Sequence, residues 1–150
     1  MPPRRYVAVC GASEATPSQL EAAREVGRLL ARSGAVVING GFGGVMAAAS
    51  EGAASEGGMV VGILPDGDRR GANPHLTLAL ATGLGQARNA VIVTAADSVI
   101  AIGAGWGTLS EIALARRLDR PVFALDTWKV NGLETVDSPA EAVERALEEN

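Results

Sequence analysis

Several residue types are scarce in this chain, and each scarcity excludes a class of site. The sequence has one cysteine, which excludes an internal disulfide, and one histidine, which leaves no histidine pair to hold a metal ion. Aromatic residues make up 3% of the chain, too few for a platform on which nucleic-acid bases stack. No apolar run reaches the roughly 18–20 residues that cross a membrane. We therefore expect no metal site, no resident cofactor, no nucleic-acid partner and no membrane contact.

The rest of the composition is that of an ordinary globular protein. The 150 residues are 47% hydrophobic and 20% charged, so we expect residues 1–150 to form a single domain with its own core. The 17 acidic residues outnumber the 13 basic ones, and the N-terminal residues lack a signal-peptide pattern, so we expect a cytoplasmic protein. Glycine is abundant: 19 residues against an average of roughly 7%. These glycines are clustered, and their clusters are the place to look for function.

Short apolar runs alternate with helical patterns along the whole chain. We expect strands at 6–10, 35–38, 59–64, 76–81, 98–102 and 121–125. Helices are expected at 17–33, 45–56, 86–95 and 108–118, and from 139 to the C-terminal end, with capping boxes beginning at Thr16 and Ser138. This alternation predicts an α/β fold: a doubly wound, mainly parallel sheet with helices on both faces.

Glycine-rich loops follow several of the expected strands. Gly11 ends the first strand, and residues 40–44 and 103–107 follow two others. In a parallel sheet these loops share one edge, where free backbone amides and helix N-termini suit a phosphate group. Neither loop matches the dinucleotide or P-loop fingerprints. Glycines at strand ends also serve tight turns and close packing, but two such loops on one edge favour a ligand site.

Arg88 and Glu111 are the candidate catalytic residues. A helix from Arg88 and a returning strand to residue 102 bring Arg88 to the edge that carries the 103–107 loop, and Glu111 follows that loop by one turn. Each has a structural alternative. Glu111 would close a capping box that begins at Thr108, and Arg88 would be a solvated arginine at a helix start. A cation there opposes the helix dipole, which suggests an anionic partner.

Two further residues near these loops have more than one interpretation. Trp106 lies within the 103–107 loop, where it would stack on a base, cover the core or contact another subunit. Cys10 ends the first strand and is most simply a small core residue. Trp128 has no assigned role.

Four motifs in the expected order resemble those of the LONELY GUY (LOG) proteins, also labelled "lysine decarboxylase-like". NGGFGGVM at 39–46 resembles their GGGxxGLM motif, and VGILP at 61–65 resembles their VGVIP strand. Arg88 precedes Asp97 by nine residues, as the family's arginine precedes its aspartate. GAGWGTLSE at 103–111 resembles PGGxGTxxE. The resemblance covers nearly the whole chain.

This resemblance implies a Rossmann-like domain that binds a nucleoside 5′-monophosphate and hydrolyses its N-glycosidic bond, releasing the base and ribose 5-phosphate. Arg88 and Glu111 take the catalytic positions, and the family implies a homodimer or homotetramer. A decarboxylase is rejected because pyridoxal phosphate would need Lys129, which lies outside every motif. The candidate ligand-binding residues are Gly11, Ser13, Gly40, Gly41, Gly43, Gly44, Met46, Gly103, Gly105, Trp106, Gly107 and Thr108.

The chain departs from the motifs in ways that leave a second function open. Gly103 replaces the proline of the last motif, and Ala104 replaces its first glycine. The Asn73-Pro74 pair and GLGQARN at 83–89 are similar to a bacterial branch that includes molybdenum-cofactor carrier proteins. Such carriers bind a phosphorylated pterin without hydrolysing it. The sequence therefore predicts either a phosphoribohydrolase or a non-catalytic carrier of a phosphorylated heterocycle.

Overall fold

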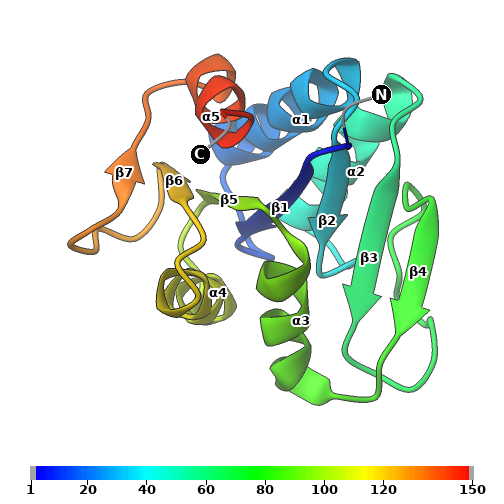
Figure 1. The fold of residues 1–150 in the computed structure, drawn as a ribbon. Coiled ribbons are helices and arrows are strands. Elements are labelled where there is room, and N and C mark those ends of the chain that lie inside the picture. The colour runs from blue at the N-terminus through cyan, green and yellow to red at the C-terminus, as the bar shows by residue number, and fades with distance from the viewer. Residues whose placement is uncertain (1–2, 149–150) are drawn as a thin grey trace.

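The computed structural model describes residues 3–148, which form seven strands and five α-helices (Figure 1). The strands are β1 (Tyr6–Gly11), β2 (Val36–Asn39), β3 (Val60–Leu64), β4 (Leu78–Ala81), β5 (Ser98–Ile102), β6 (Val122–Leu125) and β7 (Glu134–Thr135). The helices are α1 (Pro17–Arg32), α2 (Val45–Ser55), α3 (Arg88–Ala95), α4 (Trp106–Arg117) and α5 (Pro139–Ala146), and a short 3-10 helix (Gly85–Ala87) leads into α3.

All seven strands belong to one parallel sheet in the order β4-β3-β2-β1-β5-β6-β7. The chain moves outward from β1 to β4, then returns to the other side of β1 to form β5. The predicted doubly wound, Rossmann-like fold is therefore confirmed, with one strand more than expected. The order reverses between β1 and β5, which is where α/β sheets of this kind bind ligands.

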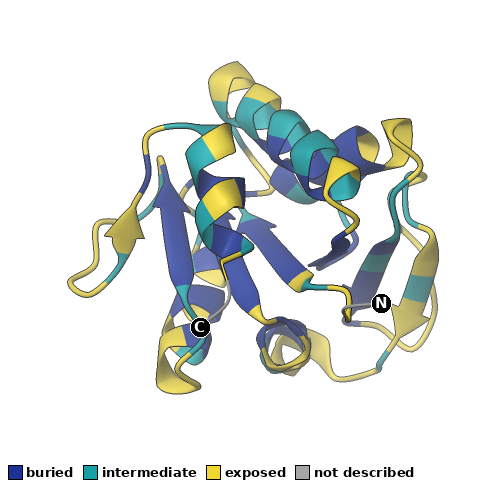
Figure 2. Ribbon diagram, turned by 45° about the horizontal axis from the view of Figure 1, so that its top comes forward, coloured by how far each residue is buried: buried dark blue, intermediate teal, exposed yellow. Residues whose placement is uncertain are grey.

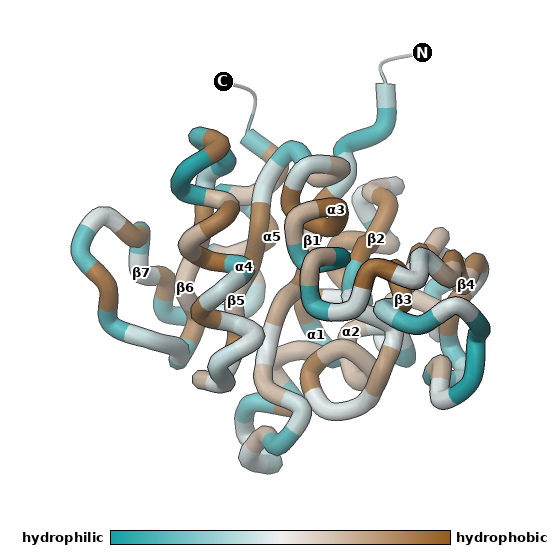
Figure 3. Tube along the Cα trace, turned by 90° about the horizontal axis from the view of Figure 1, so that it is seen from below, coloured by the Kyte–Doolittle hydropathy of each residue, from teal (hydrophilic) through white to brown (hydrophobic). Residues whose placement is uncertain are grey.

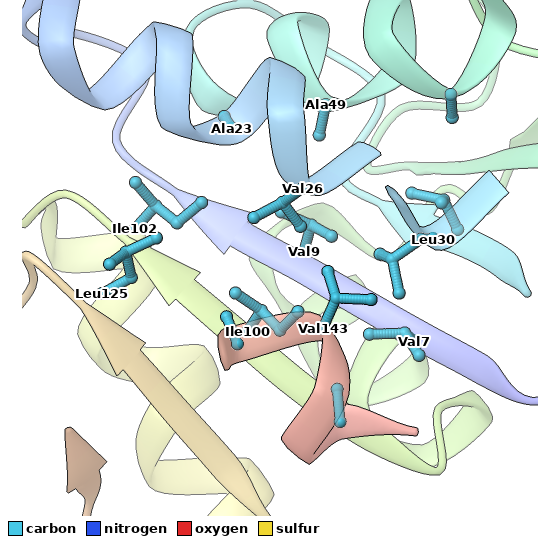
Figure 4. Packing of buried hydrophobic residues seen from close by; sticks show 14 of the residues in the cluster. Val7, Val9, Ala23, Val26, Leu30, Ala49, Ile100, Ile102, Leu125 and Val143 are labelled. Carbon is cyan, nitrogen blue, oxygen red and sulfur yellow. The ribbon is translucent and has the colours of Figure 1, made fainter. Parts of the chain in front are cut away.

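Two hydrophobic layers hold the helices on the sheet. Val9, Ile100 and Ile102 point toward the face covered by α1, α2 and α5 (Figure 4). The alternate residues of the same strands, among them Ala8 and Cys10, point toward α3 and α4. The central strands are buried on both faces, whereas β4 and β7 at the two ends of the sheet are largely exposed (Figure 2). In Figure 3 the hydrophobic stretches accordingly follow the strands, and hydrophilic stretches mark outer loops.

Among the described residues, side chains cap α1 and α5 as expected, whereas α2, α3 and α4 begin without a side-chain cap. Thr16 begins α1 with a complete capping box, and the Ser138 hydroxyl accepts a hydrogen bond from the Glu141 amide at the start of α5. The helix expected to begin after Thr108 begins instead at Trp106, with Gly105 as its N-cap. None of the described helices is both long and apolar enough to cross a bilayer.

Helices α1 and α2 pack so closely that glycine is required at their contact. A Cβ at Gly27 would overlap the carbonyl oxygen of Ala49, and a Cβ at Gly52 would overlap that of Arg24. Gly27 lies inside α1, where alanine would ordinarily favour the helix by about 1 kcal/mol. The close contact reverses that preference.

We expect Gly27→Ala to lower the free energy of unfolding by about 1–3 kcal/mol, because the added methyl forces the two helices apart. Chemical denaturation measures the change. Gly67→Ala is the matched control: Gly67 has open space around its Cβ position, so its effect is expected to stay within about 0.5 kcal/mol. Equal stability of Gly27→Ala and the wild type would contradict the packing described here.

Candidate functional site

A pocket of about 230 Å³ lies at the point where the strand order reverses. Its wall comes from the loop after β1, the loop after β2, the start of α3 and the first two turns of α4. Nine of the residues predicted from sequence line it: Gly11, Ser13, Met46, Arg88, Gly105, Trp106, Gly107, Thr108 and Glu111. Four lining residues were not predicted: Ala12, Phe42, Gln86 and Asn89. The pocket thus lies at the edge of the sheet where the glycine-rich loops were expected to form a ligand site.

The other predicted glycines do not line the pocket: Gly40, Gly41, Gly43, Gly44 and Gly103. A Cβ at Gly40 would lie 2.6 Å from Arg88 Nη1, so the missing side chain makes room for the guanidinium. Gly44 has a φ of +67°, and a Cβ there would overlap the backbone of Ala12. These two glycines shape the site through close approach. Direct contact of this loop with a ligand stays a prediction.

Arg88 is buried at the first position of α3, with only 6% of its surface exposed. Its Nη1 donates to the Asn89 side-chain oxygen at 2.6 Å, and its Nε has no hydrogen-bond partner. Among residues 3–148 no carboxylate oxygen lies within 4.0 Å of the guanidinium. Burial lowers the pKa of Arg88, and the more distant charge of Glu111 raises it. The solvated arginine considered from sequence is therefore wrong; a cation with unfilled donors lines the pocket.

Glu111 lines the same pocket from the second turn of α4 and is 7% exposed. Burial raises the pKa of its carboxyl group to about 7, although the neighbouring Cys10 thiol and the Arg88 guanidinium act in the opposite direction. The capping-box alternative is wrong, because Thr108 is already the third residue of α4 and cannot be its N-cap. The helix instead places Glu111 against the sheet, where it changes charge near neutral pH.

Thr108 and the start of α4 offer hydrogen-bond donors to the pocket. Thr108 is 2% exposed, and its hydroxyl has no partner among the described residues. Among the helices of residues 3–148, α1 and α5 have side-chain caps. Helix α4 begins after Gly105 without one. Its first backbone amides are therefore free, and the helix dipole makes this end positive. Such an arrangement suits an anion.

Trp106 stands at the rim of the pocket with 78% of its surface exposed, so it does not cover the core. Its ring centroid lies 5.2 Å from that of Trp128, with the two planes tilted by 36°. Trp128 Nε1 donates to the Gly105 carbonyl oxygen at 2.9 Å. Trp128, unassigned from sequence, thus supports the first residue of α4. Cys10 is buried, as expected, and burial raises the pKa of its thiol well above the usual value.

Known proteins similar to this chain share both its sequence pattern and its fold. An uncharacterized protein from Archaeoglobus fulgidus is 42% identical over 138 residues, 91% of each chain. The molybdenum cofactor binding protein of Rippkaea orientalis superposes with a TM-score of 0.91 at 36% identity, covering 95% of both chains. The molybdenum cofactor carrier protein of Chlamydomonas reinhardtii gives a TM-score of 0.87 at 28% identity, covering 97% of this chain and 99% of that one. Residues 4–149 match the SLOG cluster4 family, and the chain therefore belongs to that family.

Proposed function

We propose that this protein is a non-catalytic carrier of a phosphorylated heterocycle such as the molybdenum cofactor, held in the pocket between β1 and α4. The observation that carries the proposal is Arg88, a buried guanidinium with an unpartnered Nε and no carboxylate within 4.0 Å in the described chain. Burying a cation without a counterion is costly. An anionic ligand supplies the missing charge.

A phosphate group fits the donors that surround Arg88. A guanidinium binds phosphate through two parallel hydrogen bonds, which a lysine does not do. The free amides of α4 and the Thr108 hydroxyl add further donors on the same side of the pocket. Arg88 Nε and the Thr108 hydroxyl have no hydrogen-bond partner to give up when a ligand binds.

The carrier function is favoured over hydrolysis by two further points. The similar structures from Rippkaea orientalis and Chlamydomonas reinhardtii are described as a molybdenum cofactor binding protein and a molybdenum cofactor carrier protein. Gly103 and Ala104 also depart from the hydrolase motif, next to the loop that would hold the phosphate. Both points fit a protein that binds a phosphorylated ligand without cleaving it.

Glu111 supports a second candidate, the LOG-type phosphoribohydrolase. A carboxyl group with a pKa of about 7 has both of its forms available near neutral pH. The acid would protonate the departing base, and the carboxylate that remains would stabilise the positive charge on the sugar. Water would then add to the anomeric carbon and give its proton to that carboxylate. Arg88 lines the same pocket and would hold the 5′-phosphate.

A thermal-shift series distinguishes the two candidates. AMP and a pterin monophosphate are compared with adenosine and the unphosphorylated pterin. For the carrier we expect only the phosphorylated compounds to raise the melting temperature, because a ligand at 100 times its Kd adds about 2.7 kcal/mol to stability. We also expect no free adenine or ribose 5-phosphate after incubation with AMP. Product formation would establish the second candidate instead, and no shift with either phosphate would contradict both.

A further inference from the structure

Aromatic residues are scarce in this chain, yet they gather around the pocket. The sequence has two Trp, two Phe and one Tyr. Phe42 and Trp106 line the pocket, and Trp128 packs against Trp106. Three of these five side chains thus lie at one end of the sheet, although the hydrophobic core itself is built almost wholly from aliphatic residues.

The two lining rings stand on opposite sides of the site. Phe42 belongs to the loop between β2 and α2, and Trp106 is the first residue of α4, which follows β5. In the sheet, β1 lies between β2 and β5. The loop after β1, with Gly11 and Ala12, therefore forms the floor between them. The two aromatic residues thus come from segments on either side of this floor.

Packing against the described residues of its own chain does not account for the position of Trp106. A tryptophan with 78% of its surface exposed leaves a large apolar area in water, a cost that burial elsewhere would avoid. The ring is nevertheless supported, because Trp128 contacts it and is itself anchored to Gly105. A supported, exposed aromatic ring at a pocket rim is preorganised to stack on a second ring.

Phe42 links this aromatic slot to the anion site. The guanidinium carbon of Arg88 lies 6.0 Å from the centre of the Phe42 ring. The positive charge and the aromatic walls thus belong to one continuous pocket, with the free amides of α4 next to Trp106. The pocket therefore offers both hydrogen-bond donors for a phosphate and aromatic surface for a ring.

We propose that Trp106 and Phe42 contact the planar conjugated ring of the ligand, with Trp106 stacking on it. Trp128 is a positioning residue that holds Trp106 in place. This inference rests on the proposed anion site and specifies the class of ligand. The pocket selects phosphates that carry a flat heteroaromatic ring, a purine or a pterin, over sugar phosphates and inorganic phosphate.

Calorimetric titration of Trp106→Ala, Trp106→Phe and wild type tests the assignment, with AMP, ribose 5-phosphate and inorganic phosphate as probes. We expect Trp106→Ala to weaken AMP binding about tenfold, because stacking on an aromatic side chain contributes that much per base. Binding of ribose 5-phosphate and inorganic phosphate should not change, and Trp106→Phe should keep most of the AMP affinity. Tyr6→Ala removes an exposed aromatic ring at the opposite end of β1 and should leave all three affinities unchanged.

Trp128→Phe keeps an aromatic ring but loses the hydrogen bond to Gly105. We expect it to lose part of the preference for AMP over ribose 5-phosphate, whereas a purely structural role would weaken both ligands equally. The inference is overturned if Trp106→Ala binds AMP as the wild type does, or if it loses all three probes in parallel. If the wild-type protein binds ribose 5-phosphate and AMP equally, the aromatic slot is overturned but the proposed anion site is not. If the wild-type protein binds no phosphate compound, both the aromatic slot and the proposed function are overturned.

Discussion

Arg88→Met is expected to weaken the binding of AMP or a pterin monophosphate about 100-fold while leaving the fold intact. The loss follows from the removal of two charge-assisted hydrogen bonds to the phosphate, at about 1.5 kcal/mol or more each. Stability should change little, because loss of the hydrogen bond to the buried Asn89 side chain is offset by removal of a buried cation that lacks a carboxylate partner. Titration calorimetry measures the first effect, and thermal unfolding without ligand measures the second.

Arg70→Met is the matched control for charge. It changes the net charge by the same amount, but the Arg70 side chain is 92% exposed in the loop between β3 and β4. We expect its ligand affinity to equal that of the wild type. An Arg88→Met protein that still binds AMP as tightly as Arg70→Met would show that the phosphate lies elsewhere. A marked drop in melting temperature would show that Arg88 holds the fold together instead.

Glu111→Gln is expected to remove a pH dependence from the stability of the protein. The pKa of Glu111 is about 7 in the folded state, above its ordinary value of 4.5. Between these two values the unfolded chain loses a proton that the folded chain keeps, so wild-type stability falls as pH rises. The full difference is about 3 kcal/mol. We expect the two proteins to match near pH 4 and the variant to be the more stable by that amount at pH 8.

Denaturation at a series of pH values measures this difference. Arg88 from α3 and Cys10 from β1 are the charged or titratable groups that act on Glu111, and the pKa of the Cys10 thiol lies well above this range. Glu144→Gln, on the exposed side of α5, provides the control, since its curve should follow that of the wild type. Parallel curves for Glu111→Gln and the wild type would show that Glu111 ionises normally in the folded protein.

The architecture was predictable because each central strand is a continuous apolar run between turn residues. These runs specify strands that are buried on both faces, and only a parallel sheet with two helical layers provides that burial. β7 was not predicted: it is the exposed pair Glu134–Thr135, which has no apolar pattern and is ordered by pairing with β6. The start of α4 was also not predicted, because the glycines on either side of Trp106 have low helix propensity.

The position of the site was predictable, but the environment of its residues was not. Chain connectivity alone placed Arg88 and Glu111 at one edge of the sheet. Local pattern left open whether Glu111 closes a capping box or serves the site, and only tertiary packing reveals that it is buried beside Cys10. Phe42 and Asn89 lie within the motifs at 39–46 and 83–89, but a motif alone does not indicate that their side chains line the pocket. Trp128 contributes through its hydrogen bond to the carbonyl oxygen of Gly105, which lies 23 residues earlier in the chain.

The floor of the pocket belongs to the least deformable part of the molecule. Gly11 ends the central strand where a Cβ would overlap both the Ile102 carbonyl oxygen and the Val45 side chain, so β1, β5 and α2 meet there without spare room. We expect tight packing of this kind to resist local opening, so that amide exchange is slow here. A ligand of the proposed site would therefore meet a rigid floor, and adaptation to its shape would come from the side chains at the rim.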